Sequence, residues 1–135
     1  MSARHLETGE KGERAAEDYL RAHGYRVVER NWRCRSGELD LICDQGGTIV
    51  FVEVKTRTNG AMADPCGAVN RAKKARLSRA AGEYLTIHDA WGRPCRFDMV
   101  SVLNGTNGDA PDIEHLENAF ELTHSGLGAC PWQPW

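Results

Sequence analysis

The sequence predicts a mixed α/β domain in which helices flank one central sheet. Residues 7–23 and 71–85 have the composition of helices, and four other stretches have the alternation or β-branched composition of strands. Their order along the chain is helix, three strands, helix, strand, which favours a mixed sheet. The length of 135 residues corresponds to one domain, which we assign to residues 1–122, followed by a tail at 123–135.

The first helix, at residues 7–23, carries acidic side chains on its packing face. Ala16 and Leu20 recur at helical spacing and define that face, and both Glu13 and Glu17 fall on the same stripe. A carboxylate directed toward the core is unusual, so one of the two is a candidate functional residue. For Glu13 the alternative is a carboxylate that reaches solvent from the edge of the helix or caps a neighbouring loop. The helix alone does not say which.

Two predicted strands follow, separated by a basic loop. Residues 25–30 form the first strand, and residues 31–37 form a loop that carries Arg33 and Arg35. The second strand, at residues 38–43, alternates in character. Leu39, Leu41 and Cys43 fall on one face, and Glu38, Asp40 and Ile42 on the other.

Residues 48–55 give the strongest strand signal, because they are β-branched or aromatic almost throughout. The stretch 44–47 before them is a turn. Val50, Val52 and Val54 share one face, and Ile49, Phe51, Glu53 and Lys55 share the other.

The rest of the chain alternates between loops and regular elements. Residues 56–70 have no period and contain Gly and Pro, which predicts a mobile loop. A helix at 71–85 and a strand at 96–103 follow. Residues 112–122 are ambiguous between strand and helix. The tail, residues 123–135, ends in a Trp- and Pro-rich run and is either disordered or an aromatic clasp.

The predicted hairpin brings acidic residues together. A four-residue loop between Cys43 and Thr48 places Glu38 opposite Glu53 and Asp40 opposite Phe51 in an antiparallel pair. Asp40 is then diagonal to Glu53, within reach of a shared ion. A slip of one residue in the register would separate them.

Carboxylates that converge on an apolar face repel one another unless a cation lies between them. Magnesium fits, because one or two protein carboxylates suffice when water and phosphate complete its shell. Lys55 on the same face could position an attacking water. The alternative is a surface salt bridge between Lys55 and an acid, which explains one pair of charges and leaves the other acids unexplained.

These runs resemble a known family. Gly37-Glu38-Leu39-Asp40-Leu41-Ile42, followed by Phe51-Val52-Glu53-Val54-Lys55-Thr56-Arg57, is similar to the bacterial YraN family, whose pattern resembles archaeal Holliday junction resolvases and other restriction-endonuclease-like nucleases. The resemblance covers roughly residues 9–120. It includes Asn31-Trp32-Arg33, the helix at 74–85, Arg96-x-Asp98-x-Val100 and Asn118-Ala119-Phe120.

The resemblance implies a restriction-endonuclease-like fold and a magnesium- or manganese-dependent active site. That site maps onto Asp40, Glu53 and Lys55, with the Val54 carbonyl as a further candidate ligand. Glu38 belongs to the YraN pattern and is a further candidate metal ligand, although it has no fixed place in the wider nuclease motif.

The resemblance also favours Glu13 over Glu17. Resolvases place a helical Glu eleven residues before the glycine that ends the helix, and that spacing leads from Gly24 back to Glu13. Glu13 is therefore expected to assist catalysis as a further acid or as a support for the metal ligands.

A basic patch at residues 71–79 has two interpretations. It is either a solvated helix face or, through Lys73, Lys74 and Arg76, a phosphate-binding surface. Arg33, Arg35 and Arg57 are further candidate contacts to nucleic acid. Arg96 and Asp98 most simply form an ion pair.

The resulting prediction is a metal-dependent endonuclease acting on nucleic acid, DNA rather than RNA, with a branched or structured substrate as the family-level expectation. Such substrates often imply a symmetric homodimer. The alternatives are an inert nucleic-acid-binding module and a protein-interaction domain. No apolar run is long enough to span a membrane, and residues 1–10 lack the apolar core of a signal peptide, so we expect a cytoplasmic protein.

Overall fold

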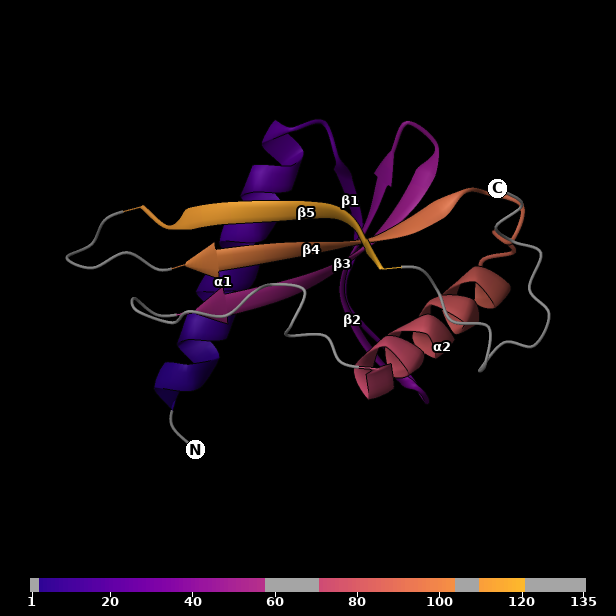
Figure 1. The fold of residues 1–135 in the computed structure, drawn as a ribbon, viewed down its shortest axis with the longest axis horizontal. Helices are drawn as coiled ribbons and strands as arrows, with labels where there is room; N and C mark the ends of the chain where they lie inside the picture. The colour runs from indigo at the N-terminus through magenta and orange to yellow at the C-terminus, as the bar shows by residue number, and fades with distance from the viewer. Residues whose placement is uncertain (1–2, 58–70, 104–109, 121–135) are drawn as a thin grey trace.

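Two helices cover opposite faces of one five-stranded sheet (Figure 1). The structure is a computed structural model that describes residues 3–57, 71–103 and 110–120. The elements are α1 (Ala3–Ala22), β1 (Arg26–Cys34), β2 (Gly37–Gln45), β3 (Thr48–Arg57), α2 (Arg71–Ile87), β4 (Cys95–Leu103) and β5 (Asp112–Phe120).

The sheet is mixed, as the sequence predicts. Its strand order is β1-β2-β3-β4-β5, and every neighbouring pair is antiparallel except β3 and β4. A parallel pair needs a crossover connection, and α2 lies within that connection. Residues 112–120, which the sequence leaves ambiguous, form the antiparallel edge strand β5.

Each helix closes a separate apolar core. On the α1 side, Ala16 and Leu20 are fully buried against Val50, Val52 and Val54 of β3. On the α2 side, the apolar stripe of α2 packs against the other face of the sheet. Its members include Leu77, Ala80, Ala81, Tyr84 and Leu85, together with Phe51, Phe97 and Phe120.

Helix α1 ends where the sequence predicts. Gly24 has a left-handed φ of 89°, and the Tyr25 N–H donates to the Leu20 carbonyl at 3.0 Å. This pattern of hydrogen bonds satisfies a carbonyl that the end of the helix would otherwise leave open.

The predicted four-residue hairpin loop is wrong, but the strand faces predicted for the paired residues of β2 and β3 are correct. Gly46 and Gly47, with φ of 58° and 94°, alone connect β2 to β3, so Gln45 pairs with Thr48. Two residues of positive φ fit a tight hairpin. The register therefore differs by two residues from the predicted one, and an even difference leaves the side chains of the paired residues 41–45 and 48–52 on their expected faces.

Leu39 does not follow the predicted alternation. It was expected beside Leu41 and Cys43, yet it packs on the α2 side with Ile42. The β2–β3 ladder ends at the Leu41–Val52 pair, and beyond this point Leu39 pairs with Trp32 of β1, which packs against the same core. Glu38 and Asp40 therefore lie in the part of β2 that is beyond its ladder with β3.

The predicted basic loop at residues 31–37 is also wrong. Strand β1 continues to Cys34, with Arg33 paired to Glu38, and only Arg35 and Ser36 form the turn. A register shift between Val27 and Glu29 lets the long strand follow β2.

The predicted mobile loop lies almost wholly in residues 58–70, which are outside the described part of the chain, as is the tail at 123–135. Among the helices that the structure describes, none is long and apolar enough to cross a bilayer. The cytoplasmic location stays a prediction.

Candidate functional site

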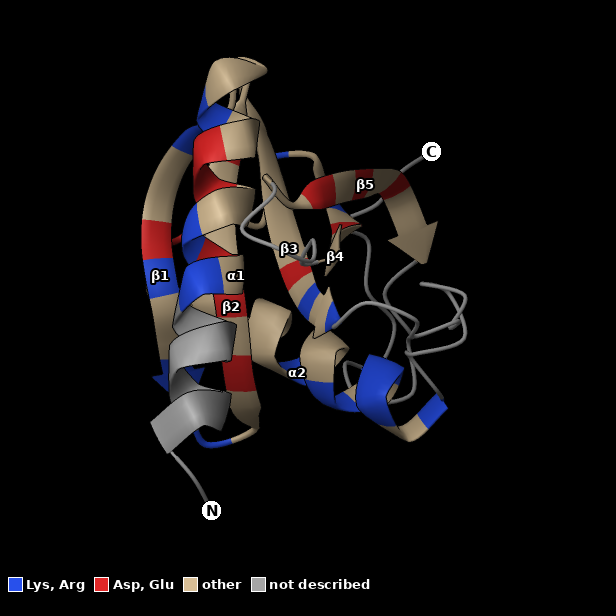
Figure 2. Ribbon diagram, turned by 90° about the vertical axis from the view of Figure 1, so that its left-hand side faces the viewer, with Lys and Arg blue, Asp and Glu red and all other residues tan. Residues whose placement is uncertain are grey.

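A polar pocket lies between α2 and the ends of β2 and β3 that hold the predicted acids. Its volume is about 240 Å³. The lining includes Gly37, Glu38, Asp40, Glu53, Lys73 and Arg76, with Leu77 of α2 alongside. Figure 2 shows acidic positions on β2 and β3 and basic positions along α2.

Asp40 is fixed to the neighbouring strand by its carboxylate. The backbone N–H of Val54 donates to Asp40 Oδ2 at 2.8 Å. The β2–β3 ladder ends at the Leu41–Val52 pair, so Asp40 and Glu53 lie just beyond it, and their side chains share a hydrogen bond. The two acids are therefore within contact distance, as the predicted diagonal arrangement requires.

The surroundings of Asp40 oppose its negative charge. Burial, the Glu53 carboxylate and, more weakly, the charge of Glu13 raise the pKa of Asp40 from an ordinary 3.8 to about 8, although the Val54 N–H works in the other direction. A cation between these groups would remove the repulsion. The folded chain thus holds two carboxylates in an arrangement that favours a positive ligand.

Glu53 already has one cationic partner. Its side chain is 8% exposed, and Lys73 Nζ of α2 lies 2.6 Å from Glu53 Oε2. Burial disfavours the charged form of Lys73, but its hydrogen bonds to Glu53 and Lys55 hold its pKa above the usual value. Asp40 and Glu53 together form what we call the acidic cluster, and Lys73 is its charged partner.

Lys55 is close to Lys73 as well as to the acids Glu53 and Asp40. The hydrogen bond to Lys73, followed by burial and the charge of Lys73, lowers the pKa of Lys55 despite the attraction of Glu53 and Asp40. An amine whose proton is held less firmly is suited to accept or pass a proton at this position.

The two candidate glutamates of α1, Glu13 and Glu17, have different contacts. Arg30 donates two hydrogen bonds to Glu17, at 2.7 and 2.6 Å, and Arg21 pairs with it as well. Glu17 is thus a structural ion-pair partner. Glu13 and Glu17 line the same hollow outside the pocket, but it is the charge of Glu13 that contributes to raising the pKa of Asp40.

A close contact sets the position of Glu13. A Cβ added at the adjacent Gly12 would lie 2.9 Å from Thr56 Cβ, closer than side chains approach in folded proteins. Only glycine lets this turn of α1 come so near the end of β3. The sequence contains Gly12 but gives no local sign of this contact.

The donor set fits a magnesium-type ion. Within the described residues, no three His, Cys, Asp or Glu side chains converge as a complete ligand set. Magnesium needs only one or two carboxylates, and Asp40 and Glu53 supply them as hard oxygen donors. Val54 is placed beside Asp40 through its N–H group.

Glu38 sits at the rim of the pocket. Its side chain is 40% exposed and accepts a hydrogen bond from Arg33 Nε at 2.8 Å. A rim carboxylate that is already paired is a less suitable metal ligand than Asp40 or Glu53. Arg33 is correspondingly tied to Glu38.

The predicted nucleic-acid contacts are distributed unevenly around the pocket. Arg76 and Lys73 line it, whereas Lys74 lies over the Phe120 ring at 5.8 Å. Arg35 is exposed in the β1–β2 turn. Arg57 follows Lys55 on the same strand face, and in the described part of the chain its buried Nε has no hydrogen-bond acceptor.

Lys73 was predicted only as a surface contact, and its place in the acidic cluster was missed. The signal was present, because Lys73, Leu77, Ala80 and Tyr84 recur at helical spacing and the last three are buried. A lysine on the packing stripe of an amphipathic helix points to a buried partner, just as the stripe of α1 singles out its glutamates.

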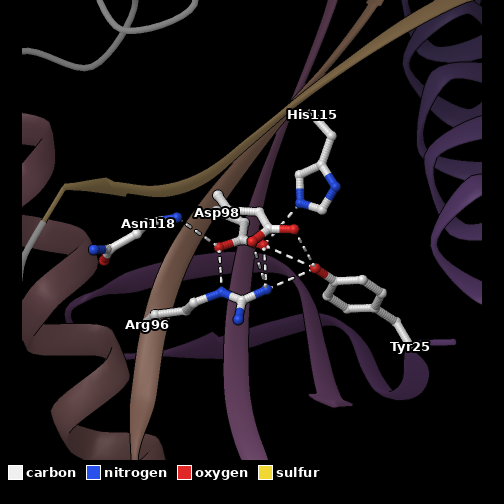
Figure 3. Close-up of polar contacts among 6 residues, drawn as sticks. Tyr25, Arg96, Asp98, His115 and Asn118 are labelled. Carbon is white, nitrogen blue, oxygen red and sulfur yellow. Dashed lines mark hydrogen bonds and ion pairs between the residues drawn. The ribbon is translucent and has the colours of Figure 1, made fainter. Parts of the chain in front are cut away.

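A second polar cluster surrounds the fully buried Asp98 (Figure 3). Arg96 Nε and Nη2 donate to it at 2.9 and 3.1 Å, His115 Nε2 lies 2.7 Å away, and the Asn118 N–H donates at 3.0 Å. Burial acts to raise the pKa of Asp98, yet these hydrogen bonds hold it below the usual value. The predicted Arg96–Asp98 ion pair is confirmed.

This cluster joins Tyr25, the residue before β1, to strands β4 and β5, and it is not part of the pocket. Arg96 Nη2 donates to the Tyr25 hydroxyl at 2.6 Å, and burial followed by the charge of Asp98 raises the pKa of Tyr25 to about 12. None of its members lines the pocket that contains Asp40. Its partners lie far apart in the chain, so local sequence patterns did not reveal them.

Residues 12–102, which span most of the elements described above, match the family described as "Uncharacterised protein family UPF0102". The chain belongs to the UPF0102 family. The YraN resemblance predicted from the sequence motifs is thereby confirmed.

UPF0102 relatives match this chain along most of its length. A UPF0102 protein of Nitratidesulfovibrio vulgaris is 46% identical over 136 residues, covering 100% of this chain and 99% of its own. Relatives from Geobacter metallireducens and Beutenbergia cavernae are 44% and 53% identical, over 92% and 80% of this chain and 100% and 91% of their own.

Among solved structures, this UPF0102 chain aligns with SfsA of Pyrococcus furiosus in complex with Ca²⁺. The alignment covers 84% of this chain and 63% of SfsA, with 16% identity and a TM-score of 0.39. A score this low does not assign a shared fold. The restriction-endonuclease-like fold therefore stays a prediction.

Proposed function

We propose that this UPF0102 protein is a metal-dependent nuclease that hydrolyses phosphodiester bonds in nucleic acid, on a restriction-endonuclease-like fold. One observation carries the proposal: the facing strands β2 and β3 hold Asp40 and Glu53 in a pocket with basic walls, where the pKa of Asp40 is raised to about 8. Such clustering of acids is costly in a structural role and useful for binding a cation.

In this proposal Asp40 and Glu53 hold Mg²⁺ or Mn²⁺, with the Val54 carbonyl and Glu38 as secondary candidates. The bound ion would supply a Lewis acid and an activated water. Lys55, with its lowered pKa, orients that water and accepts or passes its proton. Glu13 supports the site by adding negative charge near Asp40.

The basic residues around the pocket would bind the phosphate backbone. Arg76 is exposed at the wall, and Arg57 lies two residues after Lys55 on β3, with a buried Nε that lacks an acceptor among the described residues. Arg33, Arg35 and Lys74 would extend this contact beyond the pocket. Phosphate contacts position nucleic acid without reading its sequence, which suits a substrate recognised by shape.

We propose DNA, in branched or otherwise structured form, as the substrate, and a symmetric homodimer as the assembly that would match its symmetry. Light scattering of the purified protein tests the dimer. A monomer at all concentrations would remove that part of the proposal without touching the site.

The test of the function is a cleavage assay on branched DNA, linear duplex, single-stranded DNA and RNA, with Mg²⁺ or Mn²⁺. We expect cleavage of at least one substrate and a loss of about a hundredfold or more in Asp40→Asn and in Glu53→Gln. Asp44→Asn, a change at the other end of β2, controls for the general effect of replacing an acid in this strand and should cleave normally.

Other outcomes lead to the alternatives. Nucleic-acid binding without cleavage, unchanged by metal or by Asp40→Asn, would show an inert binding module. If the protein neither binds nor cleaves any of the four substrates, the nuclease proposal fails and a protein-interaction domain becomes the better account.

A further inference from the structure

Lys73 occupies the position beside the Glu53 carboxylate that a metal ion bound by Glu53 would need. Its Nζ lies 2.6 Å from Glu53 Oε2, and the side chains are only 23% and 8% exposed. A charge-assisted hydrogen bond at this distance between two largely buried side chains is among the stronger polar contacts in proteins. The acidic cluster thus already contains one positive charge of its own.

This ion pair competes with a divalent cation. An ion coordinated by Glu53 draws on the same carboxylate, and its charge repels an ammonium held within hydrogen-bonding distance of that carboxylate. The Lys55 amine, which also contacts Lys73, leaves still less room for another positive charge. Metal binding at Glu53 therefore weakens the hold of Glu53 on Lys73.

A released Lys73 would remain in the pocket. It belongs to the first turn of α2, and Arg76, one turn later, lines the same wall. A phosphate that approaches the metal would meet both side chains. The ammonium that neutralises Glu53 in the resting protein is thus positioned to neutralise a phosphodiester once a metal has replaced it.

We propose that Lys73 is an internal cation that holds Glu53 until metal binds and is then transferred to the phosphate of the nucleic acid, so that metal and substrate strengthen each other's binding. This inference rests on the proposed function and assigns to Lys73 the coupling between its two ligands. Coupling of this kind is reciprocal: the factor by which metal raises affinity for nucleic acid equals the factor by which nucleic acid raises affinity for metal.

The first test is calorimetric titration of Mn²⁺ into the wild type, Lys73→Gln, Lys73→Arg and Arg79→Gln. Arg79 is an exposed residue of the same helix and controls for the loss of one positive charge at a distance. We expect Lys73→Gln to bind Mn²⁺ about tenfold more tightly, equivalent to about 1.4 kcal/mol. Lys73→Arg, which keeps the charge, and Arg79→Gln should stay within about twofold of the wild type.

The second test measures binding of a short fluorescein-labelled DNA duplex by anisotropy, with and without Ca²⁺ as an oxygen-liganded cation. The gain in DNA affinity on adding Ca²⁺ should be clearly larger in the wild type and in Arg79→Gln than in Lys73→Gln. Circular dichroism confirms that each variant is folded.

The outcomes separate this inference from the proposed function. If the wild type binds Mn²⁺ but Lys73→Gln binds it no more tightly, or shows an equal gain in DNA affinity, the transfer by Lys73 is refuted and the metal site stands. If neither protein binds Mn²⁺, the metal site and the role of Lys73 are refuted together.

Discussion

Asp40→Asn should make the metal-free protein less sensitive to pH. The variant keeps the shape of the side chain and an oxygen that can accept the Val54 N–H, but it removes the charge that the pocket opposes. Because the pKa of Asp40 is raised in the folded chain, folding favours its neutral form. The wild type therefore loses stability as pH rises from the unfolded pKa toward the folded one, a window from about 4 to about 8.

The size of the effect follows from the shift. Each pH unit between the two pKa values is equivalent to about 1.36 kcal/mol, so the three units from pH 5 to pH 8 would give about 4 kcal/mol. Water in the open pocket and the charged Lys73 beside Glu53 screen the repulsion at Asp40, so only part of this energy is realised. We expect Asp40→Asn to gain about 2 kcal/mol relative to the wild type over that interval.

The assay is urea unfolding of both proteins in EDTA at several pH values, with Asp44→Asn as a matched control. Hydrogen bonds from Arg93 and the Gly47 N–H lower the pKa of Asp44, so its contribution is present at neutral pH and lost only as pH falls through the acidic range. The stability difference between Asp44→Asn and the wild type should therefore stay constant from pH 5 to pH 8.

Adding Mn²⁺ provides an internal check. A metal that binds only the folded state should restore the stability of the wild type near pH 8 and leave Asp40→Asn nearly unchanged. The reasoning would be refuted by an Asp40→Asn variant that loses stability at pH 8, since that result would make Asp40 an ordinary stabilising carboxylate.

Three further predictions concern the parts that surround the pocket. Gly12→Ala should lose about 1 kcal/mol of unfolding free energy, because the crowding against Thr56 outweighs the better helix propensity, and adding Thr56→Ala should recover most of it in thermal unfolding; a stabilised single variant would contradict the close contact. Asp98→Asn should cost about 3 kcal/mol in urea unfolding, because it leaves Arg96 without its partly buried partner, and a loss below about 1 kcal/mol would show that the cluster is dispensable. Arg76→Gln should lower the salt dependence of DNA binding by about one phosphate contact in a titration against salt, and an unchanged slope would place Arg76 off the DNA.

The sequence predicted the acidic face correctly because a strand repeats every two residues. The β-branched run in β3 assigns Glu53 and Lys55 to the face opposite the valines without any knowledge of the turn. The four-residue loop prediction overlooks that two consecutive glycines, Gly46 and Gly47, are a signal for a tight hairpin. The error in register is even, so within the β2–β3 ladder it changes which residues face each other but not which face they occupy.

Long-range packing explains what the sequence did not reveal. The Lys73–Glu53 ion pair depends on the angle at which α2 crosses the sheet, and the contacts of Asp98 with Tyr25 and His115 join segments far apart in the chain. No local period contains such information. Leu39 is a further case, because it lies beyond the end of the β2–β3 ladder and packs on the opposite face of the sheet from the predicted one.

The most direct test of the central claim is calorimetric titration of Mn²⁺ into the wild type and into a double variant with Asp40→Asn and Glu53→Gln. Our account predicts saturable binding to the wild type that disappears in the double variant, because these two carboxylates are the principal ligands. Absence of saturable binding to the wild type, or equal binding to the double variant, would contradict it.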